Sequence, residues 1–258
     1  TVPPKTKATV LLDRVVLTNA YPVLTVSGGK GSKIRLSYEE SLFKYPEVSF
    51  DRLIKGNRND VKKCAMRDNY KFDEFMPDGG AHRVFSPLWW RTFRFLQIDI
   101  ETGAEPVTIE DLSAVFTGYP FLQKAKFDSS SPELAKMWEV GWRTARLCAV
   151  ETYFDCPFYE QLQYGGDTRV QAVLSYYVAG DDRLGRNAID LMWNSRIPEG
   201  LTQSRYPSRM TQIIPTFSLA WIGIIHDHYM FRGDLAFTSK YLDGMKEALN
   251  WFESHKLK

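Results

Sequence analysis

Three carboxylates lie close together in residues 153–169, a short stretch with the sequence YFDCPFYEQLQYGGDTR. They are Asp155, Glu160 and Asp167, and aromatic and amide side chains separate them. Aromatic rings pack on the apolar faces of a pyranose, carboxylates and amides bind its hydroxyls, and a partly desolvated carboxylic acid protonates a leaving oxygen. These residue types in this spacing favour a site that cleaves a glycosidic bond.

The backbone of this stretch is predicted to be irregular. Pro157 ends any helix that arrives from upstream, and Gly165-Gly166 allows a tight turn before the next helix begins. A purely structural interpretation stays open, because Asp167 stands where the N-cap of that next helix would be. From the residue types alone, the acids either carry catalysis or hold the loop and cap the helix.

The order of these residues resembles the signature of the α-L-rhamnosidases of glycoside hydrolase family 78. The resemblance rests on several runs in the same order, namely Asp155-Cys156-Pro157, Glu160, Gly166-Asp167, Thr168-Arg169-Val170-Gln171, QSRYPS at 203–208 and IPTFS at 214–218. Many relatives have an Arg-Asp-Glu-Arg stretch and a Trp where this chain has Tyr159-Glu160-Gln161-Leu162 and Tyr164. The spacing is also shorter here, so the three acids align more securely than the two tyrosines.

The resemblance implies a role for each residue of the motif. Glu160 would be the general acid, Asp155 and Asp167 would bind rhamnose hydroxyls, and Tyr159 and Tyr164 would contact the sugar. The implied mechanism is inverting. Glu160, kept protonated by apolar surroundings, donates to the leaving oxygen, while a second carboxylate about 6.5–9.5 Å away activates water. The family's general base lies on a later stretch, and no residue of this chain matches it.

Two further groups of residues invite a functional interpretation. The connection 199–215 is long enough to be functional, and its Arg205 would bind sugar hydroxyls, hold a catalytic carboxylate ionised, or only anchor the loop. His226-Asp227-His228 is not expected to bind a metal, because the two histidines point about 200° apart on a helix. We expect surface or interface histidines there, with no metal site and no cofactor.

Composition limits the possible partners. The chain has 258 residues and a formal net charge of +2, which gives no indication of nucleic-acid or acidic-membrane binding. Three cysteines fit neither a metal spacing nor an even disulfide framework. No apolar run has transmembrane length. The resemblance implies a rhamnose-containing oligosaccharide or glycoside as substrate, and it leaves the compartment open, with the periplasm or the exterior favoured over the cytoplasm.

The character of the chain changes near residue 120. Residues 1–120 carry β-branched and aromatic runs separated by turn signals, which predict an antiparallel β-sandwich. One of these runs lacks strict alternation, so a bulge is expected between Phe95 and Ile98. Residues 121–258 show helical patterns, and the resemblance implies that they are the first helices of an (α/α)6 toroid. The patterns predict helices over residues 132–150, 168–179, 181–195, 216–231 and 234–254.

The chain begins at Thr1 without a methionine and ends within a helical pattern, so we expect a fragment that the remainder of a parent polypeptide completes. Lacking its base and much of its toroid, the fragment is expected to be inactive alone. Two other interpretations stay open. One is a different α/α-toroid glycosidase or lyase. The other is a non-catalytic carbohydrate-binding protein whose acids only hold hydroxyls.

Overall fold

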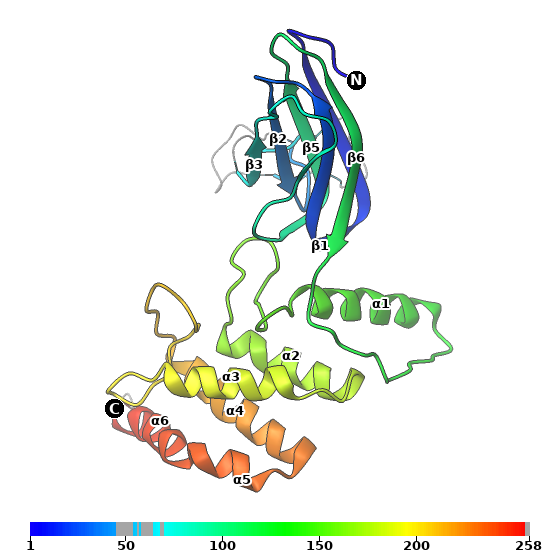
Figure 1. Cartoon of the computed structure of the whole chain (residues 1–258). Helices are drawn as coiled ribbons and strands as arrows, with labels where there is room; N and C mark the ends of the chain where they lie inside the picture. The colour runs from blue at the N-terminus through cyan, green and yellow to red at the C-terminus, as the bar shows by residue number, and fades with distance from the viewer. Residues whose placement is uncertain (45–53, 56, 58–63, 68–69, 256–258) are drawn as a thin grey trace. The chain divides into compact units, whose positions relative to one another are not determined.

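The computed structural model describes residues 1–44, 54–55, 57, 64–67 and 70–255. The chain divides into two compact units, Thr1–Thr117 and Gly118–Lys258. The first unit consists of β-strands and the second of α-helices, as Figure 1 shows. Among the helices of the described residues, none combines the length and the apolar character that crossing a membrane requires.

Among the described residues of the first unit, six antiparallel strands form one sheet, in the order β3-β2-β5-β1-β4 with β6 paired to β1. The strands are β1 (Lys7–Gly28), β2 (Lys33–Glu39), β3 (Phe72–Phe75), β4 (Arg83–Phe85), β5 (Arg91–Glu101) and β6 (Val107–Phe116). Strand β1 pairs with β5 along its first part and with β6 along its second part. The sheet therefore curls, and side chains of β1, β2, β5 and β6 share one core. The antiparallel strands are confirmed, whereas a two-sheet sandwich stays a prediction.

The expected bulge between Phe95 and Ile98 is wrong. Strand β5 pairs residue by residue with both β1 and β2 over this segment, and the irregularity lies in β1 between Asp13 and Thr18. Leu96 belongs to the main core, whereas Phe95 packs into a second, smaller apolar cluster. Neighbouring strand residues face opposite ways, so apolar clusters on both faces remove the alternation from the sequence without any bulge.

The second unit begins with a long irregular segment and continues as helices. They are α1 (Pro132–Leu147), α2 (Gly165–Val178), α3 (Arg183–Asn194), α4 (Pro215–Arg232), α5 (Leu235–Thr238), the 3₁₀ turn η2 (Ser239–Tyr241) and α6 (Leu242–Ser254). Helix α4 contacts α2, α3, α5 and α6, so it is the element on which this unit is assembled. These helices are consistent with the start of an α/α toroid, and the complete toroid stays a prediction.

The single helix expected over 234–254 is instead divided into α5, η2 and α6. Asp234 caps α5 by accepting the backbone N–H of Phe237 at 2.9 Å, after Gly233 has ended α4 in the left-handed conformation. The 3₁₀ turn brings Tyr241 into the apolar core, where its hydroxyl donates to Asp190 of α3. Tertiary packing of one aromatic residue therefore interrupts a pattern that is helical in the sequence.

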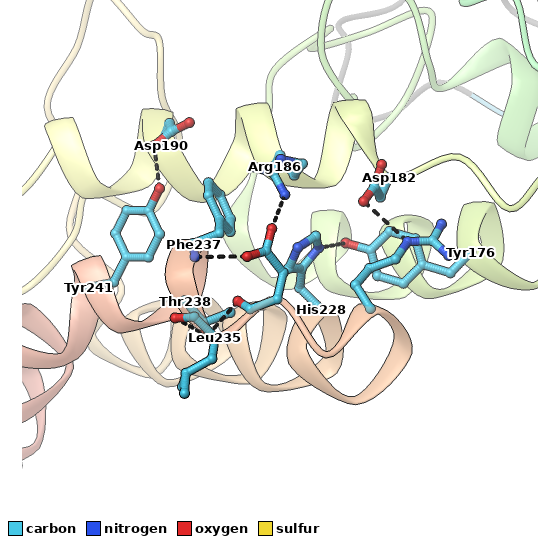
Figure 2. Close-up of polar contacts among 11 residues, drawn as sticks. Tyr176, Asp182, Arg186, Asp190, His228, Leu235, Phe237, Thr238 and Tyr241 are labelled. Carbon is cyan, nitrogen blue, oxygen red and sulfur yellow. Dashed lines mark hydrogen bonds and ion pairs between the residues drawn. The ribbon is translucent and has the colours of Figure 1, made fainter.

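A buried histidine lies among these helices, as Figure 2 shows. His228 of α4 is fully buried, its Nδ1 lies 3.3 Å from the Tyr176 hydroxyl, and its ring lies edge-on against Phe237. Burial disfavours the imidazolium and lowers the pKa of His228. The expectation of surface or interface histidines is therefore wrong for His228. It holds for His226, which is exposed and lies beside Asp227.

Candidate functional site

Residues 153–164 form an irregular loop that is tied down at both ends. The Tyr153 hydroxyl, fully buried, donates to Ser175 of α2 at 2.8 Å. The backbone N–H of Asp155 donates to the carbonyl of Leu162 at 2.9 Å, and the N–H of Leu162 donates to Asp155 Oδ1 at 3.1 Å. Asp155 thus closes the loop with both its backbone and its side chain, while remaining partly exposed.

Cys156 holds the turn that presents Glu160. Its sulfur accepts the backbone N–H of Glu160 at 3.3 Å, and its carbonyl accepts the N–H of Gln161 at 3.2 Å. Gln161 adopts a left-handed conformation with φ of 55°, and its amide Nε2 donates to the carbonyl of Pro157 at 2.9 Å. Burial raises the pKa of the Cys156 thiol, so the sulfur stays neutral and acts as a packing and accepting group.

Glu160 is linked to a distant loop through a tyrosine. The Tyr164 hydroxyl donates to Glu160 Oε2 at 2.8 Å, and Nη1 of Arg205 donates to the Tyr164 oxygen at 3.0 Å. The guanidinium carbon of Arg205 lies 5.6 Å from the centre of the Tyr164 ring. The structure therefore brings together three of the residues that the sequence analysis singled out, although 41 residues separate Tyr164 from Arg205.

A short backbone ladder aligns the two loops. Tyr164 and Arg205 form an antiparallel bridge, the N–H of Gly165 donates to the carbonyl of Ser204 at 2.9 Å, and the N–H of Tyr206 donates to the carbonyl of Gln163 at 3.1 Å. The buried Gln163 side chain adds a hydrogen bond from Nε2 to the carbonyl of Tyr206 at 2.8 Å. Sequence reasoning missed Gln163, because nothing local to it indicates a partner some 40 residues away.

Asp167 lies in the first turn of α2, where Tyr164, not Asp167, is the N-cap residue. The expectation that Asp167 caps this helix is therefore wrong. The residue as a whole is exposed, yet its carboxyl group is partly desolvated, and this raises its pKa. The negative charges of Asp155 and Glu160 raise it further. Asp155 and Glu160 are therefore within electrostatic range of Asp167, while a shared substrate site for the three acids stays a prediction.

The two glycines before Asp167 serve close packing and not a tight turn. Gly165 and Gly166 are the first residues of α2, and neither has a positive φ. A Cβ at Gly166 would lie 2.9 Å from Cε1 of Phe217, a residue in the first turn of α4. The Phe217 ring also meets the Tyr164 ring edge-on, with centroids 6.2 Å apart. The sequence analysis included Phe217 in the IPTFS motif and gave it no role. The structure shows that its ring packs against Gly166 and Tyr164.

The remaining expected features are less enclosed. Tyr159 is partly exposed, and its ring meets Phe158 edge-on at 5.0 Å between centroids. Glu160 is exposed, so the apolar enclosure expected around it is not formed by the residues that the structure describes. Within the same residues, no group of three or more His, Cys, Asp and Glu side chains is arranged to hold a metal ion.

Several buried polar atoms in this region have no hydrogen-bond partner in the described part of the chain. They are Oε1 of Gln163, Gln171 and Gln203, Oγ1 of Thr168 and Nε of Arg205. Buried polar atoms in proteins are normally paired, because an unpaired one costs roughly 1–3 kcal/mol. These atoms lie in the loop, in α2 and in the paired loop, where bound water is the usual partner of such groups.

The same part of the chain matches a known domain family. Residues 122–258 match the model of the bacterial α-L-rhamnosidase six-hairpin glycosidase domain. No curated protein sequence matches the chain.

Solved structures share the fold over nearly the whole chain. A family 78 rhamnosidase from Bacillus sp. GL1 has a TM-score of 0.82 at 22% identity, covering 96% of this chain and 24% of that protein. The Klebsiella oxytoca rhamnosidase with rhamnose bound has a TM-score of 0.78 at 14% identity, covering 96% and 49%. The Streptomyces avermitilis α-L-rhamnosidase in complex with L-rhamnose has a TM-score of 0.72 at 18% identity, covering 99% and 24%.

The chain therefore spans between about a quarter and a half of the length of these three proteins. Identities this low establish a shared fold, while the family model itself covers more than half of the 258 residues. On that match, the chain belongs to the bacterial α-L-rhamnosidase six-hairpin glycosidase family.

Proposed function

We propose that this chain is part of a glycoside hydrolase that removes terminal α-L-rhamnose from an oligosaccharide or glycoside. The observation that carries the proposal is the hydrogen-bonded series from Arg205 through Tyr164 to Glu160, with Asp167 within electrostatic range of Glu160 and of Asp155. Acid–base cleavage of a glycosidic bond needs carboxyl groups in this kind of polar, partly desolvated site. Membership of the family supports rhamnose as the sugar.

In this proposal Glu160 is the general acid. It protonates the leaving glycosidic oxygen as the bond to the anomeric carbon breaks, and it leaves that step as a carboxylate. Asp155 and Asp167 accept hydrogen bonds from rhamnose hydroxyls, because an ionised carboxylate offers acceptor oxygens only. Tyr159 and Tyr164 contact the sugar ring, and Arg205 adds donors close to Glu160.

We also propose an inverting reaction, in which a second carboxylate activates water on the opposite face of the sugar. The two carboxyl groups of an inverting pair stand about 6.5–9.5 Å apart, which leaves room for that water. No residue of this chain matches the family's base, so the base belongs to the remainder of the parent polypeptide. The greater length of the relatives supports this division, with residues 121–258 as the first part of the toroid and residues 1–120 as the β domain.

Replacing the proposed acid is the direct test. We expect Glu160→Gln in the full-length protein to lower kcat about 10²- to 10⁴-fold on a rhamnoside with a poor leaving group, because the amide cannot donate the required proton. The loss should be much smaller on a dinitrophenyl rhamnoside, whose leaving group departs without protonation. Rhamnose binding, measured by calorimetry, should persist.

Glu151→Gln is the matched control, because Glu151 is an exposed residue near the loop to which no role is assigned. It should leave kcat and KM unchanged. Full turnover by Glu160→Gln would contradict the assignment of the acid. A wild-type protein that cleaves other glycosides and no rhamnoside would indicate a different toroid glycosidase, and one that binds rhamnose without cleaving any glycoside would be a carbohydrate-binding protein.

A further inference from the structure

Arg205, Tyr164 and Glu160 form a chain of hydrogen bonds whose direction is fixed by chemistry. A guanidinium has donors only, so in the 3.0 Å contact with Tyr164 it is Arg205 that donates. The Tyr164 oxygen accepts that bond, and its single hydrogen is then directed to Glu160 Oε2 at 2.8 Å. When Glu160 is ionised it has acceptors only, so each link then has one sense, with the carboxylate oxygen at its accepting end.

The phenol in the middle keeps its proton. Burial raises the pKa of Tyr164, and the hydrogen bond to Glu160 and its negative charge raise it further, against the smaller opposite effect of Arg205. Tyr164 thus remains a neutral donor across the range in which a carboxyl group titrates. As long as Tyr164 donates to Oε2 of Glu160, that oxygen is occupied as an acceptor, and a proton that the carboxylate takes up goes to the other oxygen, Oε1.

We propose that Arg205 is a positioning residue that acts on Glu160 through Tyr164, fixing the transferable proton on Oε1. The proposal rests on the proposed function of Glu160 as general acid, and it selects among the interpretations that the sequence left open for Arg205. Arg205 does not need to touch the sugar in order to act. Its guanidinium orients one hydroxyl, and that hydroxyl determines which oxygen of the acid faces the leaving group.

The surrounding structure distinguishes this role from simple anchoring of the loop. The loop is already held to residues 163–165 by backbone hydrogen bonds and by the Gln163 side chain. None of these bonds uses the Arg205 side chain. The guanidinium is therefore not required to hold the ladder together, and Nη1 of Arg205 donates to the hydroxyl that serves Glu160.

Kinetics of single and double variants of the full-length protein test the proposal. Arg205→Met should lower kcat between about 10- and 100-fold on a rhamnoside with a poor leaving group, with KM unchanged, because the acid is misplaced and not the sugar. Tyr164→Phe should have a similar effect. Adding Arg205→Met to Tyr164→Phe should cause little further loss, because the arginine acts only through the phenol.

The pH dependence gives a readout that a purely structural role would not change. The charged and titratable groups that bear on Glu160 are Tyr164, Arg205, Asp155, Asp167 and Cys156. Removing the cation that supports the hydrogen bond to Oε2 favours the protonated acid. The basic limb of the pH profile of kcat/KM reports the loss of the proton from the general acid. In Arg205→Met this limb should therefore move to higher pH.

Arg209→Met is the matched control, an exposed arginine of the same loop, and it should leave both the profile and kcat unchanged. A raised KM with unchanged kcat in Arg205→Met would overturn the proposal and make Arg205 a substrate contact. Fully additive losses in the double variant would overturn it as well.

A measurement without turnover separates this proposal from the proposed function. In protein with ¹³C-labelled tyrosine, the Cζ resonance of Tyr164 should respond to titration of Glu160, and Arg205→Met should change the size of that response. Identical responses in the two proteins would overturn the positioning role, even if rhamnoside cleavage is confirmed. Absence of cleavage by the wild-type protein would contradict the proposed function alone, and the resonance would still decide whether Arg205 acts on Glu160.

Discussion

Glu160 is positioned by side chains that carry no charge of their own. Cys156 accepts its backbone N–H, and Tyr164 donates to its carboxylate. The three acids and the nearby cysteine could be read from one stretch of sequence, because the motif is local. The link to Arg205 could not, because it depends on a ladder between two loops that come together only when α2 and α4 pack.

A second residue-scale consequence concerns His228, whose folded-state pKa lies below its ordinary value of about 6.5. The folded protein therefore binds fewer protons at this site than the unfolded chain. The free energy of unfolding should fall as the pH decreases from about 6.5 toward the folded pKa, and the contribution of His228 is fully present above that window. Unfolding by urea at a series of pH values from 7.5 to about 5 measures this slope.

His228→Gln should make the slope shallower, since glutamine has no proton to bind. The charged and titratable groups that act on His228 are Tyr176, Asp182 and Arg186, which Figure 2 labels, together with Arg232 and Asp234, and all of them remain in the variant. His226→Gln is the control, because His226 is an exposed histidine of the same helix and should leave the slope unchanged. Equal slopes in the wild type and in His228→Gln would show that the buried imidazole is not the cause.

At the scale of elements, helix ends with local signals were predicted closely. Pro132 starts α1, Pro215 starts α4, and Gly233-Asp234 separates α4 from α5, as capping chemistry requires. The start of α2 was displaced from 168 to Gly165, because the ladder between the two loops fixes the residue at which the helix begins. The division of the last helix followed from packing of Tyr241, which no local pattern announces.

The contact between the starts of α2 and α4 leads to a prediction about Gly166. Gly166→Ala should destabilise the protein by about 1–3 kcal/mol, because the new methyl group would lie 2.9 Å from Cε1 of Phe217 and the ring would have to shift out of its contacts. Gly141→Ala is the control. Gly141 is exposed in α1 with open space around its Cα, so alanine there should stabilise the protein by about 0.5–1 kcal/mol.

Chemical unfolding of both variants decides between these outcomes. If Gly166→Ala were as stable as the wild type, the Phe217 ring or α4 would be able to move aside at no cost. The close approach of Gly166 to Phe217 would then not be a requirement of the fold. If Gly166→Ala both destabilises the protein and removes the contact between the Tyr164 and Phe217 rings, this packing also supports the site. Tyr164 is the residue that donates a hydrogen bond to Glu160.

At the scale of the whole molecule, the change from β to α character was visible in composition and periodicity alone. The curling of the sheet was not, because it depends on β1 changing partners from β5 to β6 along its length. Strand propensity identifies that a segment is extended, and it does not identify its neighbours. The family match supplies what periodicity lacks, namely that these helices belong to a six-hairpin domain.

The division of catalytic groups within the parent protein yields a last prediction. The 258-residue chain should bind rhamnose weakly and should not hydrolyse a chromogenic α-L-rhamnoside, because it has the proposed acid and hydroxyl-binding acids but no match for the base. The polypeptide extended to the length of the relatives should hydrolyse it. Adding azide to the short chain provides a control, because azide attacks the anomeric carbon without deprotonation and forms a rhamnosyl azide as the glycosidic bond breaks, so no base is needed when the acid is intact. Azide-dependent cleavage by the short chain would support both the acid and the missing base, whereas cleavage without azide would show that a carboxylate of this chain already serves as the base.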